Sequence, residues 1–383
     1  MRINTLEPWI DSKELEQLTK VIESTYVTEG PLTREFENLL QKYTGSKHVI
    51  AMANGSLAIF AALKAMGIGP GDEVIVPNLT FVATANSVIL AGATPIFCEI
   101  YCDNFAIDLS QAERLVTKNT KAIIPVHLYG KPANMSDVND FAKAFGISVI
   151  EDAAQGVGVF YKGQHTGTMS SIGVLSFYGN KTMTTGEGGV CLTNDDNLAK
   201  KLYKLKNHGR SKKGTFIHET IGFNLSFSDL QAAVGIAQFH KLKDIIDKRF
   251  EIFNAYKAGL NGQVQLVDYN REKGEMPWVN SVKVSNPDKL EEFLSNKNII
   301  SRRFFYPLDK QPCYKGSTYI NGKYTKSHCV YESHLSLPSS HHLTAQNIEH
   351  ICESILKFTD KQPAQNLDFV CTTNCCDLKL LAN

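Results

Sequence analysis

Short apolar runs alternate with segments of helical periodicity between about residues 45 and 195. Four of the runs are short and apolar, which is typical of buried strands: residues 73–77, 95–98, 121–126 and 147–150. Three segments carry apolar side chains at helical spacing: residues 57–65, 109–116 and 138–145. Strands that alternate with helices predict βαβ units, and therefore a mostly parallel sheet with helices on both faces.

Two features further along the chain modify this pattern. Residues 172–177 and 189–193 have the composition of two strands close in sequence, which predicts an antiparallel excursion within the sheet. An amphipathic pattern then predicts one long helix from about residue 228 to 249.

Beyond about residue 250 the pattern becomes that of a smaller α+β unit. It predicts a strand at 278–284 and helices at 289–294 and 348–358. The fold class is therefore α/β, and we predict three parts: a large domain with an N-terminal helical segment (1–250), a small C-terminal α+β domain (251–358) and a loosely held tail (359–383).

The composition is that of an ordinary globular protein, with 43% hydrophobic and 21% charged residues. A formal net charge of +1 provides no overall attraction to nucleic acid or to an acidic membrane. The longest apolar stretch, residues 57–63, is much shorter than the roughly 18 residues of a membrane span. We therefore expect neither nucleic acid nor a membrane as a partner.

The N-terminus lacks the charged and then apolar pattern of a secretion signal, and the nine cysteines are an odd number scattered through the chain. Both features favour reduced thiols in the cytoplasm over a disulfide framework. Cys371, Cys375 and Cys376 are conceivable metal ligands, but no fourth ligand follows at the expected spacing. We therefore predict no metal site.

Lysine and arginine are concentrated in residues 200–213. A solvated helix face followed by a mobile loop is favoured over a nucleic-acid site at this net charge. One or two of Arg210, Lys212 and Lys213 are candidates for contacting a substrate diphosphate.

Asn54-Gly55-Ser56 precedes a predicted helix. The free N–H groups and positive dipole end of such a turn suit a phosphate, although a plain helix cap formed by Asn54 or Ser56 is the alternative. Asp152 follows a predicted strand, where α/β sheets bind ligands. Its carboxylate would stabilise a protonated ring nitrogen by about 4 kcal/mol at ~4 Å; a capping role is the alternative.

Lys181 follows the next predicted strand, among aromatic residues. Desolvation there would lower its pKa and make it a Schiff-base nucleophile, whereas a surface lysine is the alternative. Ser176 would offer a hydroxyl to the same phosphate. Three glycines around Glu187 indicate a close backbone approach or a tight hairpin. An anion cradle, an acid for a ring nitrogen and a lysine at a strand end together predict pyridoxal 5'-phosphate as cofactor.

The sequence resembles the sugar aminotransferases of the DegT/StrS family, which have the fold-type I aspartate aminotransferase architecture. The resemblance covers about residues 8–358. Its marks are residues 71–77, 80–81, 126–130, 151–155, 176–181 and 184–189. Within the family, the run from Ser176 to Gly189 is most similar to the GDP-perosamine synthases.

The resemblance implies a role for each matching residue near the cofactor ring. Lys181 is the catalytic residue that bonds to the cofactor aldehyde, and Asp152 pairs with the pyridine nitrogen. Gln155 lies near the ring hydroxyl. Phe81 stacks on the ring, although periodicity alone would assign it to the core.

The phosphate site implied by the resemblance contains Gly55, Ser56 and Ser176. Asn224, which matches an asparagine that the family takes from the neighbouring subunit, completes it. The resemblance therefore implies a homodimer with shared active sites.

The chain departs from the family at two positions. Ser226 stands where relatives often have Arg, and Asp309 stands where they often have His, in a segment near the sugar nucleotide. Phe305, Tyr306 and Tyr314 are candidate substrate contacts, with core packing as the alternative.

The resemblance implies an aminotransferase of polysaccharide biosynthesis that moves an amino group from glutamate to C4 of a nucleotide-linked 4-keto-6-deoxyhexose. GDP-4-keto-6-deoxymannose, which would yield GDP-perosamine, is the first candidate substrate. A UDP- or dTDP-linked 4-keto-6-deoxyglucose, which would yield a viosamine-type product, is the alternative. A dehydratase with the same cofactor and a non-catalytic regulator are further alternatives, and Lys181 argues against the dehydratase.

Overall fold

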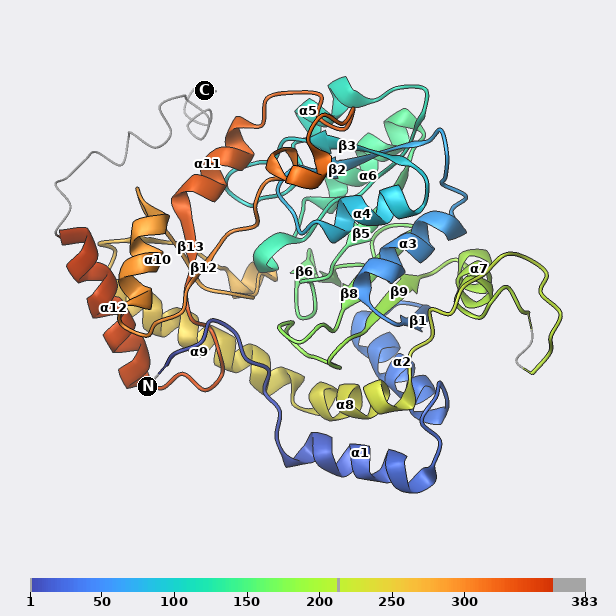
Figure 1. Ribbon diagram of the computed structural model, residues 1–383, viewed down its shortest axis with the longest axis horizontal. Coiled ribbons are helices and arrows are strands. Elements are labelled where there is room, and N and C mark those ends of the chain that lie inside the picture. Colours follow the sequence, from blue (N-terminus) through green and yellow to red (C-terminus); the bar gives the residue numbers. More distant parts are fainter. Residues whose placement is uncertain (1, 212–213, 361–383) are drawn as a thin grey trace.

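Seven strands form one mixed sheet in the computed structural model, which describes residues 2–211 and 214–360 (Figure 1). In spatial order they are β1 (His48–Met52), β9 (Gly189–Thr193), β8 (Ile172–Ser176), β5 (Ser148–Asp152), β4 (Thr120–Ile123), β2 (Glu73–Pro77) and β3 (Thr94–Cys98). β9 pairs antiparallel with β1 and β8, and the other pairs are parallel. The predicted parallel sheet and its antiparallel excursion are confirmed.

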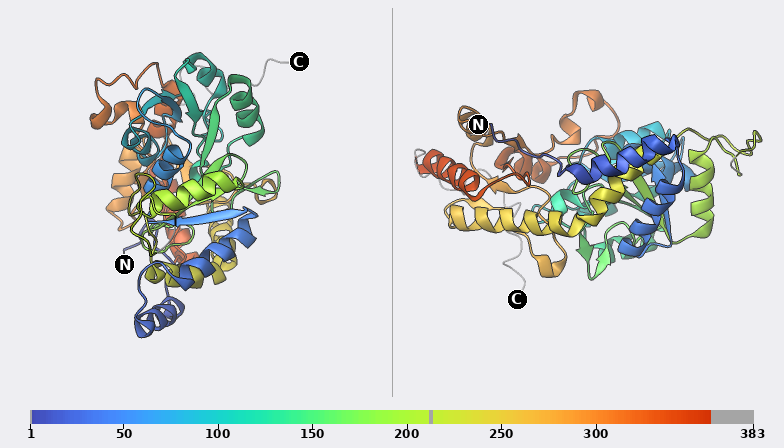
Figure 2. Two further views of the ribbon diagram at one scale, coloured as in Figure 1. Left: turned by 90° about the vertical axis from the view of Figure 1, so that its right-hand side faces the viewer. Right: turned by 90° about the horizontal axis from the view of Figure 1, so that it is seen from below.

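Helices cover both faces of this sheet, as the βαβ pattern predicts (Figures 1 and 2). One face packs on α3 (Gly55–Ala65), α4 (Ala83–Leu90) and α7 (Asp196–Lys206). The other face packs on α2 (Pro31–Thr44), α5 (Leu109–Leu115), α6 (Met135–Phe145) and α8 (Asp229–His240). Within β2, Val74 and Val76 point to the first core and Ile75 to the second, which is the alternation that a strand imposes.

A second, antiparallel sheet lies beyond the first in the order β10 (Gln265–Leu266), β11 (Ser281–Lys283), β13 (His334–Ser336) and β12 (Arg302–Arg303). Its core includes apolar residues of α9 (Leu242–Leu260), α10 (Pro287–Ser295) and α12 (Ala345–Asp360). The remaining elements are α1 (Ser12–Ser24), α11 (Thr325–Ser333), the hairpin β6 (Phe160–Tyr161) and β7 (Gln164–His165), and the 3-10 turns η1 (Leu128–Gly130), η2 (Arg271–Lys273), η3 (Leu308–Lys310) and η4 (Pro312–Tyr314).

The prediction of one helix over residues 228–249 is wrong, because the chain forms two helices that meet at Lys241. Lys241 has non-helical backbone angles (φ −107°, ψ 8°). Its buried ammonium pairs with Asp11 at 2.9 Å and with Glu14 at 2.8 Å. These partners come from α1 and the residue that caps it, so the local apolar periodicity carried no sign of the break.

The predicted domain boundary at residue 250 falls inside α9, which runs continuously from Leu242 to Leu260. The N-terminal residue Ile3 also pairs with Ile299, far beyond that boundary. The division into a large and a small domain therefore stays a prediction. Residues 361–383, with Cys371, Cys375 and Cys376, lie outside the described residues. In the part of the chain that the structure describes, no helix combines the length and apolar character needed to cross a membrane.

Gly173 provides a test of the packing inside the central sheet. A Cβ at this position would lie 2.0 Å from the carbonyl oxygen of Gly167, so Gly173→Ala requires the backbone to move. We expect it to lower the free energy of unfolding by about 2–3 kcal/mol and the Tm by several degrees. Gly322→Ala is the control, because a Cβ there meets no heavy atom within 4 Å. Equal melting temperatures for the two variants, measured by calorimetry, would contradict the packing described.

Candidate active site

Lys181 lies in the turn between β8 and β9, close to the carboxyl end of β8. The side chain is half-buried, and its Nζ lies 5.1 Å from the centre of the Trp278 ring. Burial lowers the pKa of Lys181 to about 8, although the carboxylate of Asp152 opposes the shift; the charge of Arg302 reinforces it. A larger fraction of the amine is therefore neutral near pH 8 than in an ordinary lysine, as a nucleophile requires. The surface-lysine alternative is wrong.

Asp152 is the buried last residue of β5. Its Oδ2 accepts a hydrogen bond from the Thr84 hydroxyl at 2.7 Å, and its Oδ1 accepts one from the Ala154 backbone N–H at 3.1 Å. The neighbouring Glu151 instead pairs with buried His127 at 3.0 Å. Of the two adjacent carboxylates, Asp152 is therefore the one whose charge acts on Lys181.

Gln155 and Phe81 lie in the loops that follow β5 and β2. Gln155 is buried, and its Oε1 accepts a hydrogen bond from the Tyr129 backbone N–H at 2.6 Å. Phe81 is 54% exposed, with its ring 5.6 Å from that of Phe305. The core position that periodicity would assign to Phe81 is therefore wrong. An aromatic face left open at this edge suits stacking on a flat ligand.

Gly55 and Ser176 meet where α3 begins and β8 ends. A Cβ on Gly55 would lie only 3.0 Å from the Ser176 Cβ, so a larger residue would crowd the turn. Asn54 is the capping residue, because its Oδ1 accepts from the Leu57 N–H at 2.9 Å. The Ser56 side chain remains exposed. The turn therefore caps the helix and still presents its first residues to a ligand.

The glycine-rich run after Lys181 makes the close approach that its composition predicts. A Cβ on Gly189 would lie 2.6 Å from the carbonyl carbon of Asn54, so the start of β9 lies directly against the turn at Asn54–Ser56. Gly186 has a φ of +80°, which favours glycine.

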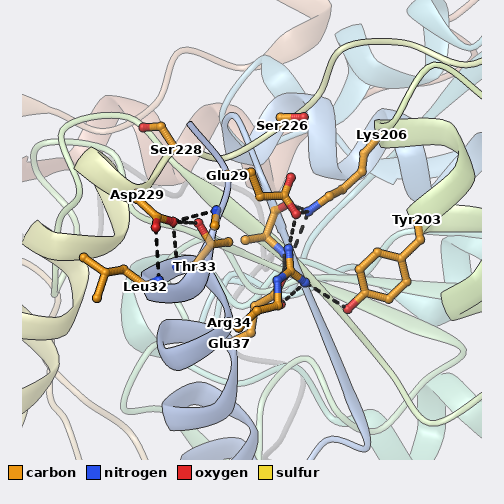
Figure 3. Close-up of polar contacts among 12 residues, drawn as sticks. Glu29, Leu32, Thr33, Arg34, Glu37, Tyr203, Lys206, Ser226, Ser228 and Asp229 are labelled. Carbon is orange, nitrogen blue, oxygen red and sulfur yellow. Dashed lines mark hydrogen bonds and ion pairs between the residues drawn. The ribbon is translucent and has the colours of Figure 1, made fainter. Parts of the chain in front are cut away.

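A cluster of charged side chains, shown in Figure 3, bonds to the backbone of β1 at Ala51, three residues before this turn. Lys206 of α7 is 2% exposed; its Nζ donates to the Ala51 carbonyl at 2.8 Å and lies 3.0 Å from Glu29 Oε1. The N–H of Ala51 in turn donates to Glu37 at 2.8 Å. Arg34 pairs with both glutamates. The prediction of a solvated face for residues 200–213 is thus wrong for Lys206.

The start of α2 is held in the same region by Asp229 of α8 (Figure 3). The Asp229 carboxylate accepts hydrogen bonds from the backbone N–H groups of Gly30, Leu32 and Thr33, at 2.8, 3.1 and 2.9 Å. It thereby satisfies orphan donors of a helix whose own capping residue, Gly30, has no side chain to do so.

Asn224 lies in an exposed segment that returns from the loop after α7. Its backbone pairs with Asn207, and the following residue, Leu225, exchanges backbone hydrogen bonds with Ala53 and Lys206 at 3.0 and 3.1 Å. Ser226, which follows Leu225, is half-buried. Arg210 contacts Asn207, whereas Lys212 and Lys213 lie outside the described residues.

The candidate substrate contacts fall into two groups. Tyr314 is buried against Phe97, so the core alternative holds for it. Tyr306 is 42% exposed, and Phe305 stacks on Tyr129 with ring centres 5.4 Å apart.

Three residues at this site were not predicted from the sequence: Thr84, Trp278 and Arg302. Thr84 orients Asp152. Trp278 donates from Nε1 to the Asn180 carbonyl at 3.2 Å, next to Lys181, and Arg302 is exposed at the start of β12. Trp278 and Arg302 are about 100 residues or more away from Lys181 in sequence, so no local spacing could associate them with it.

The chemistry of these side chains fits pyridoxal phosphate. A lysine of lowered pKa faces a fixed carboxylate, an open aromatic ring lies at the same edge of the sheet, and a glycine turn contacts a serine hydroxyl at a helix start. We propose that Lys181 bonds to the cofactor. The proposed ring contacts are Asp152, Gln155 and Phe81, and the proposed phosphate contacts are Gly55, Ser56, Ser176 and a partner's residue equivalent to Asn224.

Comparison with known proteins agrees with this chemistry. The profile of the DegT/DnrJ/EryC1/StrS aminotransferase family matches residues 8–356. GDP-perosamine synthase of Escherichia coli O157:H7 is 35% identical, covering 93% of this chain and 98% of the relative; that of Caulobacter vibrioides is 35% identical, covering 92% and 97%. A putative sugar aminotransferase from Streptococcus pneumoniae, solved in its PLP form, superposes with a TM-score of 0.89 at 25% identity, covering 94% of this chain and 99% of the other.

The pKa of Lys181 leads to a prediction for cofactor capture. Only the neutral amine attacks an aldehyde, so the capture rate by apoprotein should rise with pH through a midpoint at about 8. Asp152→Asn removes the carboxylate that raises this pKa and should move the midpoint to lower pH. Absorbance at about 400–430 nm, the range of lysine-bound cofactor, measures the rate. Asp247→Asn, on the exposed side of α9, is the control; a midpoint near that of free lysine, or one unmoved by Asp152→Asn, would contradict the geometry.

Proposed function

The chain belongs to the DegT/DnrJ/EryC1/StrS aminotransferase family and is a pyridoxal-phosphate-dependent sugar aminotransferase with the fold-type I architecture; on this basis we propose that it converts GDP-4-keto-6-deoxymannose to GDP-perosamine, with glutamate as amino donor. The observation that carries the choice of substrate is the similarity to GDP-perosamine synthases over more than nine-tenths of the chain. The similarity of residues 176–189 to the same enzymes supports it.

When bound, the cofactor supplies an aldehyde that takes up the amino group and a ring that withdraws electrons. With the cofactor bound, the Nζ of Lys181 would take the proton from the α-carbon of glutamate and pass it to the cofactor; in the second half-reaction it would take a proton back from the cofactor and deliver it to C4 of the sugar. Its pKa of about 8 suits both directions of transfer near neutral pH. Asp152, held by Thr84, stabilises a proton on the ring nitrogen.

Glutamate as donor requires a cation for its carboxylates. Arg302 fits this role because it is exposed and lies close enough to Lys181 for its charge to lower the pKa of the lysine. A guanidinium offers the planar pair of donors that a carboxylate accepts. In this proposal Arg302 binds the carboxylates of glutamate, and Phe305 and Tyr306 contact the nucleotide sugar.

The proposal includes a homodimer with shared sites. The segment that leads to Asn224 projects away from the sheet and exposes three large apolar side chains: Phe216 (89% exposed), Ile217 (74%) and Ile221 (86%) (Figure 1). Apolar side chains gathered on a protruding segment are typical of a protein interface. A second copy of the chain would cover them and receive Asn224 at its phosphate turn.

A cytoplasmic location and a role in polysaccharide biosynthesis belong to the same proposal. The six cysteines among the described residues form no disulfide with one another, which suits a reducing compartment. A nucleotide-linked amino sugar is an activated donor for building a polysaccharide chain. A viosamine-type product from a UDP- or dTDP-linked sugar is the alternative.

A substrate panel tests the proposed reaction. Purified holoenzyme is supplied with glutamate and a GDP-, UDP- or dTDP-linked 4-keto-6-deoxyhexose, and the products are weighed by mass spectrometry. We expect the GDP-linked sugar to be converted fastest. Lys181→Ala should lower kcat by at least about 10³-fold, since the nucleophile and proton carrier are lost together. Full turnover by Lys181→Ala would contradict the mechanism, and preference for a dTDP- or UDP-linked sugar would contradict the substrate.

Mixing two inactive variants tests the shared site. Lys181→Ala and Asn224→Ala are each expected to be strongly impaired as homodimers. When subunits exchange at random, half of the dimers are mixed and each has one site with both residues intact, so about one quarter of wild-type activity should return. No recovery after subunit exchange, confirmed with differently tagged chains, would contradict the contribution of Asn224 across an interface.

A further inference from the structure

Asp309 joins two parts of the chain that are far apart in sequence. Its Oδ1 accepts a hydrogen bond from Asn78 Nδ2 at 2.8 Å, and its backbone N–H donates to Asn78 Oδ1 at 2.9 Å. The N–H of Leu308 donates to the Asn78 carbonyl at 2.8 Å. Asn78 is fully buried and directly follows β2. These bonds attach η3 and the segment before it to the carboxyl end of a central strand.

His328 of α11 holds the same carboxylate from a third element. Its Nε2 lies 2.8 Å from Asp309 Oδ2 and 3.0 Å from Oδ1. Lys310 and Tyr324 also face Asp309. Burial alone would raise the pKa of Asp309, but the hydrogen bonds from His328 and Asn78 and the charge of Lys310 keep it below its usual value. Asp309 is therefore an anion that accepts from two side chains at once, and we call Asn78, Asp309 and His328 the clamp.

The clamp lies close along the chain to two aromatic residues that border the candidate active site. Asn78 is three residues before Phe81, and Asp309 is four residues after Phe305. The two rings meet at 5.6 Å. The Phe305 backbone N–H also donates to the Tyr129 hydroxyl at 3.0 Å. The Asn78–Asp309 contact therefore sets the distance between the loop that carries Phe81 and the segment that carries Phe305 and Tyr306.

We propose that the clamp is a positioning device for the nucleotide-sugar substrate: it holds Phe305 and Tyr306 beside Phe81 as one wall of the substrate site. Tyr306, with 42% of its surface exposed, is the part of this wall that is open to a ligand. Asn78 and Asp309 bond to each other and to His328, so they act through the wall and not on the reacting atoms. The inference rests on the proposed assignment of Phe81 and Lys181 to the cofactor.

Steady-state kinetics of the holoenzyme tests the clamp. Asp309→Ala should raise the KM for the nucleotide sugar about tenfold, because the wall loses its position while the catalytic groups remain. The KM for glutamate, the kcat and the absorbance of bound cofactor should stay within about twofold. His328→Ala should raise the same KM by a smaller factor, because the bonds between Asn78 and Asp309 remain. The double variant should be no worse than Asp309→Ala alone, since that change already removes the contact with His328. His328→Gln, whose amide can donate in place of Nε2, should recover most of the loss.

Asp268→Asn is the control, because it changes an aspartate whose ion pair, with Lys257, is exposed and has no contact with Asp309 among the described ion pairs. An unchanged KM for the nucleotide sugar in Asp309→Ala would overturn the proposal. Loss of cofactor absorbance, or an equal rise in both KM values, would also overturn it, since either result places the effect on the fold or on the cofactor site. A wild-type preference for another nucleotide would contradict only the proposed substrate, and the variants would then be compared with the preferred sugar.

Discussion

The desolvation of one amine opposite one fixed carboxylate is the constraint on which the rest of the site depends. Lys181 follows β8 and Asp152 ends β5, and these two strands are adjacent and parallel, with Asp152 in register with Val174. Parallel neighbours end at the same edge of a sheet, so the acid at the end of β5 and the amine in the turn after β8 come to the same edge. The balance between burial and the Asp152 charge then leaves the pKa of Lys181 at about 8.

Much of the remaining structure keeps the backbone rigid around this pair. The turn at Gly55 packs closely against Ser176 and Gly189. The strand before it is held by the buried Lys206, which contacts Ala51 and Glu29. Burial lowers the pKa of Lys206 and raises that of Glu37, so each charge depends on the other. Removing one partner of such a buried pair typically lowers the free energy of unfolding by about 3–5 kcal/mol. The cluster therefore contributes to the stability of the fold.

The substrate side of the site is built differently from the cofactor side. The proposed cofactor contacts lie at or just after strands of the seven-stranded sheet, whereas Trp278, Arg302 and Phe305 come from the second half of the chain, in or beside strands of the other sheet. On the proposed assignment, changes at Phe305 and Tyr306 would alter the accepted sugar or nucleotide, whereas changes at Trp278 and Arg302 would also act on Lys181. This arrangement agrees with a family whose members share a cofactor and differ in substrate.

The alternation of strands and helices, the parallel sheet with its antiparallel strand, and the motifs around Asp152 and Lys181 could be predicted from the sequence, because each depends on residues that are neighbours along the chain. The folded chain was needed to show that Phe81 is exposed, that Lys206 is buried, that a helix breaks at Lys241, and that Asn78 contacts Asp309 across 231 positions. Periodicity indicates only which side of a local element is apolar. Whether a polar or aromatic group is buried, paired or exposed depends on residues of other elements that contact it. Those residues are distant in the sequence, so no fixed spacing identifies them.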